Sequence, residues 1–275
     1  MDSTLKTFVK AVTPPVVASL YKKLTTKYGF SGEYDRWEDA RRDSDGYESD
    51  TILARVKEAS LKVKRGEAAY ERDSVLFDRT DYSWPLLSSL LWIASSNDNR
   101  LHVVDFGGSL GTSYYQNRRF LTHVKELEWN IVEQKKFVEC GKESFADNHL
   151  KFFEALPTSL GPKKPSVILM SSVLPYVERP YELLDRIIGL GFEYIIIDRT
   201  LSWALEDDRL SVQRVNPRIY EASYPCWILS EGKILRKLST AYNLIESFDA
   251  HSGAEISIGN ASARYRGFLH KRKTT

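Results

Sequence analysis

The segment 101–111, LHVVDFGGSLG, constrains the fold of this chain more than any other. Its apolar run ends in Asp105 and opens into a turn with glycine at positions 107, 108 and 111. A glycine-dense turn after an apolar run is typical of a buried strand that leads into a ligand-binding loop, because glycine tolerates positive φ and lets the backbone approach a ligand. We therefore predict a strand over 101–106 and a helix from about residue 112, whose first amides face the ligand.

The spacing of the glycines excludes the dinucleotide fingerprint. Counted from Gly107, G-x-G-x-x-G needs glycine at positions that Ser109 and Thr112 occupy. A second pattern fits, in which an acid and three small residues alternate along the loop: Asp105, Gly107, Ser109 and Gly111. This pattern resembles the cofactor loop of Rossmann-like methyltransferases that use S-adenosylmethionine (SAM). The resemblance implies that the acid orients the loop or reaches the methionine end of SAM through water, and that the small residues, with Gly108, form the wall of the site.

Further strand ends follow at spacings that suit this fold. The segment 129–134, WNIVEQ, predicts a second strand with Glu133 at its tip, 22 residues after Gly111, where an acid can accept both hydroxyls of a ribose. Two more segments, 150–157 and 165–180, predict a third and a fourth strand with their turns. There we place Glu154 facing the adenine edge, and Ser171 and Ser172 beneath the sulfonium or, equally, in ordinary turn hydrogen bonds.

Longer stretches resemble one family of bacterial methyltransferases that are often encoded beside surface-polysaccharide enzymes. The resemblance covers nearly the whole chain and is carried by the segments 29–40, 70–78, 103–121, 129–145, 171–184, 195–200 and 224–230. It implies SAM as cofactor, a role in polysaccharide biosynthesis, and an α/β fold of the Rossmann-like class I methyltransferase type. Such a fold has a mostly parallel sheet with an antiparallel edge hairpin. The resemblance identifies neither an acceptor nor a catalytic residue.

Composition excludes several classes of protein. The chain has 275 residues, enough for a large core, and its formal net charge of +2 gives no electrostatic reason to bind nucleic acid. Its two cysteines, Cys140 and Cys226, form no C-x-x-C motif, and no secretory pattern is present. We therefore predict neither a disulfide framework nor a metal site, and a cytoplasmic protein.

The first 27 residues have a composition of their own. Five lysines against Asp2 give this segment a local charge of +4, and apolar residues are interspersed among them. A basic amphipathic segment binds an anionic membrane surface or packs its apolar side against its own domain. Peripheral contact with the inner face of the membrane through residues 1–27 is one expectation, and packing against the domain is the other.

We predict two regions, an N-terminal helical region or cap over 1–96 and a SAM-binding methyltransferase domain over 97–275. Apolar positions between residues 52 and 63 recur at helical spacing, and Gly66 is a natural stop. Ser83 is placed to cap a helix that carries Pro85 in its first turn.

Strands and helices alternate after residue 97, which predicts a parallel sheet with helices on both faces. Beyond Arg199 we expect a long loop, a helix near 231–242, and two antiparallel strands near 243–249 and 263–271.

Candidate acceptor residues lie at the fifth strand and beyond it. A sugar hydroxyl has a pKa far above 7, so a general base should accelerate its methylation. Asp198, at the end of the fifth strand, is the first candidate, and His251, in a later loop, is the second. Arginine and aromatic side chains suit phosphates and sugar rings, and we assign substrate binding to Arg199, Arg214, Arg218, Tyr220 and Tyr224. Arg72 either closes over the cofactor carboxylate or pairs with an acid on its own helix.

The leading functional hypothesis is a SAM-dependent methyltransferase that acts on a small-molecule or glycan acceptor, a hydroxyl of a saccharide or of a nucleotide- or lipid-linked sugar. The alternative is a non-catalytic module that keeps the SAM-binding fold within a glycan-assembly complex. A nucleotide-dependent oxidoreductase is disfavoured because the dinucleotide spacing fails.

Overall fold

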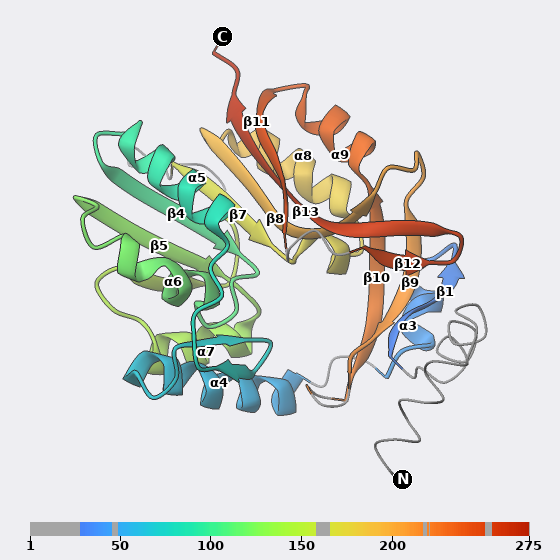
Figure 1. Ribbon diagram of the computed structural model, residues 1–275, viewed down its shortest axis with the longest axis horizontal. Helices are drawn as coiled ribbons and strands as arrows, with labels where there is room; N and C mark the ends of the chain where they lie inside the picture. Colours follow the sequence, from blue (N-terminus) through green and yellow to red (C-terminus); the bar gives the residue numbers. More distant parts are fainter. Residues whose placement is uncertain are drawn as a thin grey trace, which may run out of the picture.

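The computed structural model describes residues 28–45, 49–157, 166–216, 219, 221–250 and 255–274. Its centre is a sheet of five parallel strands in the order β6-β5-β4-β7-β8 (Figure 1). Their bounds are β4 (Arg100–Phe106), β5 (Glu126–Val132), β6 (Leu150–Phe153), β7 (Val167–Ser171) and β8 (Tyr194–Trp203). All five residues of β7 are buried, as parallel strands covered on both faces must be.

An antiparallel edge completes the sheet. β13 (Ala261–Arg272) runs antiparallel to β8, and β11 (Tyr242–Asp249) runs antiparallel to β13. This arrangement confirms the predicted α/β class, a mostly parallel Rossmann-like sheet with an antiparallel edge. The chain passes outward from β4 through β5 to β6, and then returns to the other side of β4 as β7. The sheet therefore has its topological switch point between β4 and β7, and ligands of open α/β sheets bind outside the carboxyl ends of the strands at such a point.

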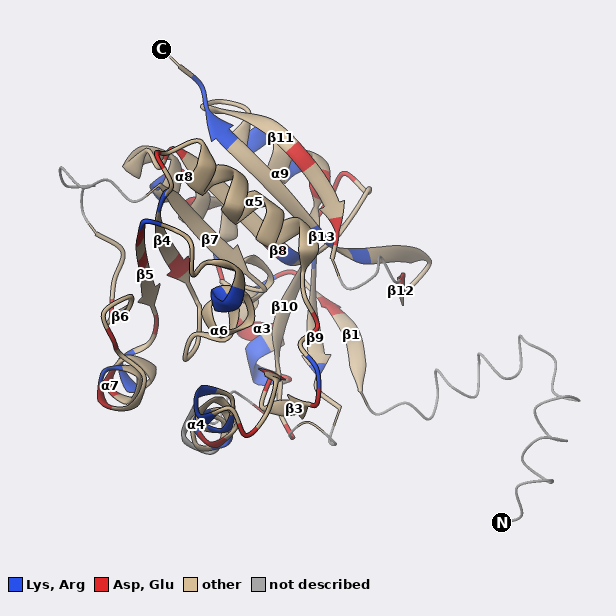
Figure 2. Cartoon of the chain, turned by 60° about the vertical axis from the view of Figure 1, so that its left-hand side comes forward, with Lys and Arg blue, Asp and Glu red and all other residues tan. Residues whose placement is uncertain are grey.

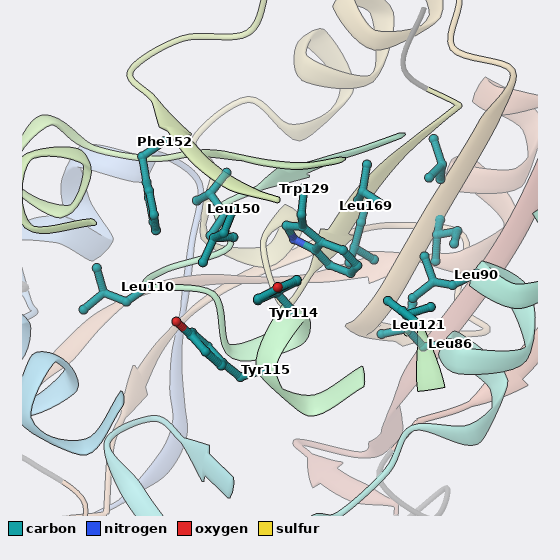
Figure 3. Packing of buried hydrophobic residues seen from close by; sticks show 14 of the residues in the cluster. Leu86, Leu90, Leu110, Tyr114, Tyr115, Leu121, Trp129, Leu150, Phe152 and Leu169 are labelled. Atoms are coloured by element: carbon teal, nitrogen blue, oxygen red, sulfur yellow. The ribbon is translucent and has the colours of Figure 1, made fainter. Parts of the chain in front are cut away.

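Alternate strand residues serve two cores, one on each face of the sheet. Val103, Ile131 and Leu169 join the cluster that contains α5 (Trp84–Ser95) and α7 (Lys135–Ser144) (Figure 3). Val104 and Ile168 join the opposite cluster, which contains α8 (Pro180–Leu190) and α9 (Glu231–Leu238). In Figure 2, α5 carries no charged residue, whereas α4 (Ser49–Arg65) and α7 carry charges of both signs. α5 is therefore the more apolar helix, and it has more buried residues than α7.

Residues before and after position 96 share one of these cores. Val56 of α4 and Leu86 and Leu90 of α5 belong to the same buried cluster as Val103 of β4. α5 begins after Ser83 with Pro85 in its first turn, as predicted, and α4 ends immediately before Gly66, whose φ is +78°. The side chain of Ser83 makes no capping hydrogen bond, so that part of the prediction is wrong.

The described part of the predicted helical region 1–96 is only partly helical, because three strands accompany its three helices. β1 (Gly29–Tyr34) precedes α3 (Trp37–Arg42), and β2 (Tyr70–Arg72) pairs with β3 (Val75–Phe77) in a separate hairpin. The two turn residues of this hairpin, Asp73 and Ser74, have φ of 52° and 65°. Consecutive positive φ values define a type I′ turn, which suits the twist of a two-residue hairpin. The strands of the hairpin are three residues each, too short for a period to be recognised.

The expected long loop after Arg199 is instead an antiparallel arm. β9 (Arg209–Arg214) pairs with β10 (Ser223–Ser230), and β1 covers the outer side of β9. The arm continues from the end of β8, where Leu229 and Ser230 of β10 pair in parallel with Ser202 and Trp203. β12 (Ile256–Ile258) adds a short strand against β13. The arm therefore extends from the carboxyl end of β8, the edge at which the switch point also opens (Figure 1).

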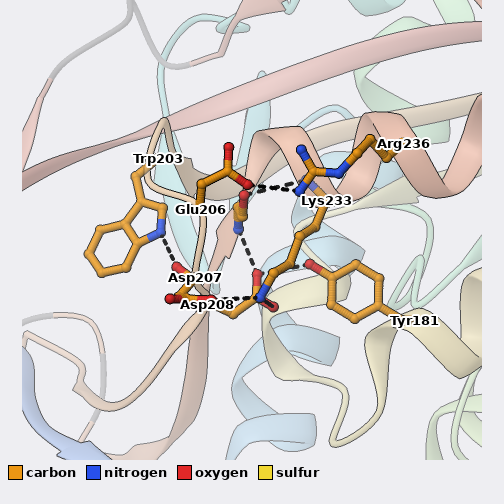
Figure 4. Close-up of polar contacts among 8 residues, drawn as sticks. Tyr181, Trp203, Glu206, Asp207, Asp208, Lys233 and Arg236 are labelled. Carbon is orange, nitrogen blue, oxygen red and sulfur yellow. Dashed lines mark hydrogen bonds and ion pairs between the residues drawn. The ribbon is translucent and has the colours of Figure 1, made fainter.

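The base of the arm is fixed by Asp208 (Figure 4). Asp208 Oδ1 accepts hydrogen bonds from Tyr181 Oη at 2.8 Å and from Ser230 N at 2.7 Å. Asp208 Oδ2 forms an ion pair with Lys233 Nζ at 3.2 Å. Because Tyr181 belongs to α8 and Lys233 to α9, this one carboxylate attaches the β8–β9 turn to both helices.

Candidate functional site

The glycine loop follows β4 directly and is held against the strand ends. Gly107 N donates to Val132 O at 2.9 Å, which ties the start of the loop to β5. Gly107, Ser109 and Gly111 have φ of +72°, +54° and +100°. A Cβ at Gly107 would lie 2.5 Å from Val173 Cγ2, so glycine is required there by the protein's own packing as well as by its φ.

Asp105 lies beneath this loop, and its side chain is only 1% exposed. Its Oδ2 accepts from Trp129 Nε1 at 2.9 Å, and its Oδ1 has no hydrogen-bond partner. Burial raises the pKa of Asp105 to about 7, against the lowering effects of the Trp129 hydrogen bond and of the Arg199 charge. A Cβ at Gly108 would lie 2.6 Å from Asp105 Cγ, so the loop rests on this carboxyl group.

Glu133 connects the tip of β5 to the same loop. Its Oε2 accepts from Gln134 N at 2.7 Å, and its own amide donates to Phe153 O at 3.0 Å. Burial raises the pKa of Glu133, and hydrogen bonds from the amides of Gln134 and Ser109 oppose that rise. The predicted proximity of the loop and this acid is therefore present: Ser109 and Glu133 meet through a backbone hydrogen bond.

The ends of β7 and β8 are joined by a compact ion pair. Ser171 Oγ donates to Asp198 Oδ2 at 2.7 Å and accepts from Arg199 Nε at 2.9 Å. Arg199 Nε also lies 3.3 Å from Asp198 Oδ2, and Asp198 is 1% exposed. Asp198 Oδ1 has no hydrogen-bond partner. Ser172, in positive φ at 58°, donates its amide to Asp198 O at 2.9 Å, so both predicted serines serve to join the two strand ends.

The β2–β3 hairpin packs against both parts of this edge. Tyr70 interacts electrostatically with Arg199, and Glu71 accepts a hydrogen bond from Thr112 Oγ1, at the first residue of α6 (Thr112–Asn117). Arg72 lies on a strand and not on a helix, and its Nη1 pairs with Asp81 at 3.2 Å. The hairpin thus links the glycine loop to the ion pair at β8.

Tyrosine side chains lie next to the ion pair on the side of the arm. Tyr176, in the short 3-10 helix Leu174–Tyr176, donates to Gln213 Oε1 at 2.8 Å and meets the ring of Tyr224 edge-on at 5.4 Å. Burial raises the pKa of Tyr176 and of Tyr265, and the charge of Asp73 adds to both shifts. We call Tyr70, Tyr176, Tyr224 and Tyr265 the tyrosine cluster. The cluster offers ring faces and hydroxyls.

Other predicted site residues lie apart from this centre or outside the described residues. Glu154 is exposed at the end of β6. Arg214 lies at the end of β9, opposite Gly29, and its charge acts on Tyr34 of β1. Arg218, Tyr220, His251 and residues 1–27 fall outside the described residues.

The Arg199 guanidinium acts on three carboxyl groups at this edge, those of Glu71, Asp105 and Asp198, and the charge of Glu133 acts on Asp105. Such an arrangement leaves an excess of buried acid, which a cationic ligand would stabilise. Within the described parts of the chain, no group of three or more His, Cys, Asp or Glu side chains is arranged to hold a metal ion.

Several site residues were not identified from the sequence. Trp129 was assigned only to a strand, yet its indole is the hydrogen-bond partner of Asp105. Glu71 and Tyr176 lie within segments that carried the family resemblance, and that resemblance was the one signal that could have pointed to them. Their positions depend on contacts between segments far apart in the chain.

Comparisons with known proteins give matches among solved structures alone. No family model matches the chain, and no curated protein sequence matches it. The N-terminal domain of EvdMO1, solved in the presence of S-adenosylhomocysteine (SAH) and D-fucose, is 12% identical over 79% of this chain and 97% of that chain, with a TM-score of 0.47. The magnesium protoporphyrin IX methyltransferase ChlM from Synechocystis PCC 6803, with bound SAM, is 12% identical over 83% and 100%, with a TM-score of 0.42. The CcbJ methyltransferase from Streptomyces caelestis is 10% identical over 69% and 90%, with a TM-score of 0.46.

No helix among the described residues combines the length and the apolar character that crossing a membrane requires.

Proposed function

We propose that this chain is a SAM-dependent methyltransferase that methylates a hydroxyl of a saccharide, or of a nucleotide- or lipid-linked sugar, in polysaccharide biosynthesis. The observation that carries the proposal is Asp105. This carboxyl group lies at the switch point, beneath a glycine loop, and its buried Oδ1 has no partner. SAM carries a sulfonium and an ammonium group against one carboxylate, so its net positive charge fits the excess of acid around Asp105.

The residues would divide the binding of the cofactor between them. Glu133, at the tip of β5, is placed to accept the ribose hydroxyls, as acids do at this position in doubly wound folds. Asp105 and the glycine loop would face the methionine end. When bound, SAM supplies a methyl group on a sulfonium sulfur, and in-line displacement then depends mainly on how the protein orients the acceptor.

The ends of β7 and β8 would receive the acceptor. Asp198 Oδ1 is the atom that would take the proton of the acceptor hydroxyl, because Oδ2 is already held by Ser171 and Arg199. The rings and hydroxyls of the tyrosine cluster suit the apolar and polar faces of a sugar. The aromatic and polar lining of this side supports a saccharide as the acceptor.

Isothermal titration of the full chain with SAM, SAH and NAD tests the cofactor. We expect SAM and SAH to bind and NAD not to bind. Gly108→Ala places a Cβ against Asp105 and should weaken SAH binding by about 10-fold or more, since the overpacked loop must shift. Gly189→Ala on α8 is the matched control, because a Cβ there meets no atom within 4 Å.

Mass spectrometry of saccharides and nucleotide sugars incubated with the protein and SAM tests the transfer. A product heavier by one methyl group would support the proposal. Binding of SAH without methyl transfer to any of these acceptors would favour the non-catalytic SAM-binding module. Binding of NAD in place of SAH would contradict both functions.

A further inference from the structure

Glu71 is a buried acid outside the central sheet. It lies on β2, is 3% exposed, and its two carboxylate oxygens have different partners. Oε1 accepts from Thr112 Oγ1, and Oε2 accepts from Ser74 N at 3.3 Å. Burial raises the pKa of Glu71, and both hydrogen bonds oppose that rise. A buried carboxyl group is costly, so its retention needs a reason beyond packing.

The hairpin turn places this carboxyl group. Asp73 and Ser74 adopt positive φ, and this conformation turns the Ser74 amide back toward Glu71. The register of the hairpin pairs Glu71 with Leu76. Because the donor and the acceptor belong to one two-stranded unit, the hairpin itself helps to orient the carboxyl group.

Thr112 is the residue at which the glycine loop becomes a helix. Gly111, immediately before it, has φ of +100° and donates its amide to Gly108 O at 3.0 Å. At the start of the loop, Gly107 N donates to Val132 O, and Gly108 rests on Asp105. The loop is therefore fixed at its start by the sheet, and at its end by a side chain from the hairpin.

We propose that Glu71 is a positioning residue for cofactor binding, acting through Thr112 to hold the glycine loop in its binding conformation. The inference rests on the proposed function and deepens it. It assigns to the hairpin a part of the cofactor affinity, although Glu71 is bonded to the loop and not to the ligand. Loss of the Glu71–Thr112 hydrogen bond would release the end of the glycine loop. Cofactor binding would then have to order the loop, and this cost would lower the affinity.

A double-mutant cycle in SAH affinity tests this role. Glu71→Ala and Thr112→Val should each weaken SAH binding by about 10-fold, the lower end for a hydrogen bond to a charged group. The double variant should bind no more weakly than the weaker single variant, because both substitutions remove the same bond. Glu71→Gln keeps an oxygen for Thr112 and should restore affinity to within about 3-fold of the wild type. Glu67→Ala, at an exposed acid four residues away, is the control.

Thermal unfolding of the same variants separates positioning from stability. A merely structural Glu71 would lower the melting temperature and leave the SAH dissociation constant of the folded protein unchanged, which would overturn the inference. Additive losses in the double variant would overturn it as well. If Glu71→Ala does not fold, Thr112→Val and Glu71→Gln still decide the question. Failure of the wild type to bind SAH would instead refute the proposed function.

Discussion

Asp105 and Asp198 are equally buried at the same edge of the sheet, but their surroundings are opposite. Asp198 has a cation and a hydroxyl on one oxygen, those of Arg199 and Ser171. Asp105 has the neutral indole of Trp129, and its pKa is raised to about 7. The proposed acceptor side thus contains its own counter-ion, whereas the proposed cofactor side has none in contact with Asp105. In the proposed function, the positive charge of SAM fills this place.

The two sides also differ in the number of sequence segments that form them. The cofactor side comes from one stretch, 105–133, in which a loop and two neighbouring strands follow each other. The acceptor side combines segments from β2, β8, β9, β10 and β13. Substitutions on the first side should therefore affect cofactor affinity, and those on the second should affect stability and turnover.

The largest effect should come from Asp198→Asn. Removing this charge leaves Arg199 buried without its counter-ion, and breaking a buried ion pair costs about 3–5 kcal/mol of unfolding free energy. SAH affinity should stay within about 3-fold, and turnover on an identified acceptor should fall at least 100-fold if Asp198 is the base. Urea unfolding and calorimetry measure the first two quantities. A stable variant with unaltered turnover would contradict both roles of Asp198.

Asp105→Asn should remove a pH dependence of the unfolding free energy that distinguishes Asp105 from Asp198. Because burial raises the pKa of Asp105 from 3.8 to about 7, the folded protein keeps a proton that the unfolded chain releases above pH 4. This group therefore lowers the unfolding free energy as pH rises from 4 to 7, by up to about 4 kcal/mol, and has no further effect above 7. The difference in stability between wild type and Asp105→Asn should follow that curve. A constant difference across this range would show that Asp105 ionises normally.

Binding of SAM should release the proton of Asp105. The positive charge of SAM favours the carboxylate, so calorimetry near pH 6.5 in two buffers of different ionisation enthalpy should show proton release in the wild type. The Asp105→Asn variant is the control and should show none from this group. Equal proton release in the two proteins would show that SAM binding does not change the protonation of Asp105.

Glu133→Ala should lower SAH affinity, the quantity that tests the ribose assignment. Loss of the hydrogen bonds that the ribose hydroxyls would donate to this carboxylate is expected to weaken SAH binding by about 1.5–3 kcal/mol. Glu139→Ala, at an exposed acid of α7, is the matched control and should bind SAH as the wild type does. An unchanged SAH dissociation constant in folded Glu133→Ala would refute the ribose assignment.

The smallest effect should come from Tyr176→Phe. This change removes the hydrogen bond to Gln213 and leaves the ring contact with Tyr224, so the unfolding free energy should fall by about 1 kcal/mol. SAH affinity should not change, because Tyr176 belongs to the acceptor side. A loss of SAH affinity would mean that the two sides are not separate.

The sequence alone determined the parallel strands, their order of appearance and the acids at their ends. Apolar runs ending in Asp105 and Glu133 are local patterns, and neighbouring parallel strands bring such ends to one edge whatever the details of packing. α7 and α8 are likewise local patterns, since each has an apolar periodicity within its own segment, and α5 is marked by an apolar stretch with Pro85 in its first turn.

Only the tertiary structure decided which side chains meet. The expected loop after Arg199 forms β9 and β10, which pair with each other, and their outer partners β1 and β8 come from distant or separate segments of the chain. The sequence singles out Arg72 as a contact of the cofactor carboxylate or of an acid on its own helix, whereas in the structure its neighbour Glu71 is bonded to Thr112 at the end of the glycine loop. The surroundings of Asp105 likewise depend on Trp129, which reaches it from the neighbouring strand β5. Register and burial decide such contacts, and neither is a property of a local segment.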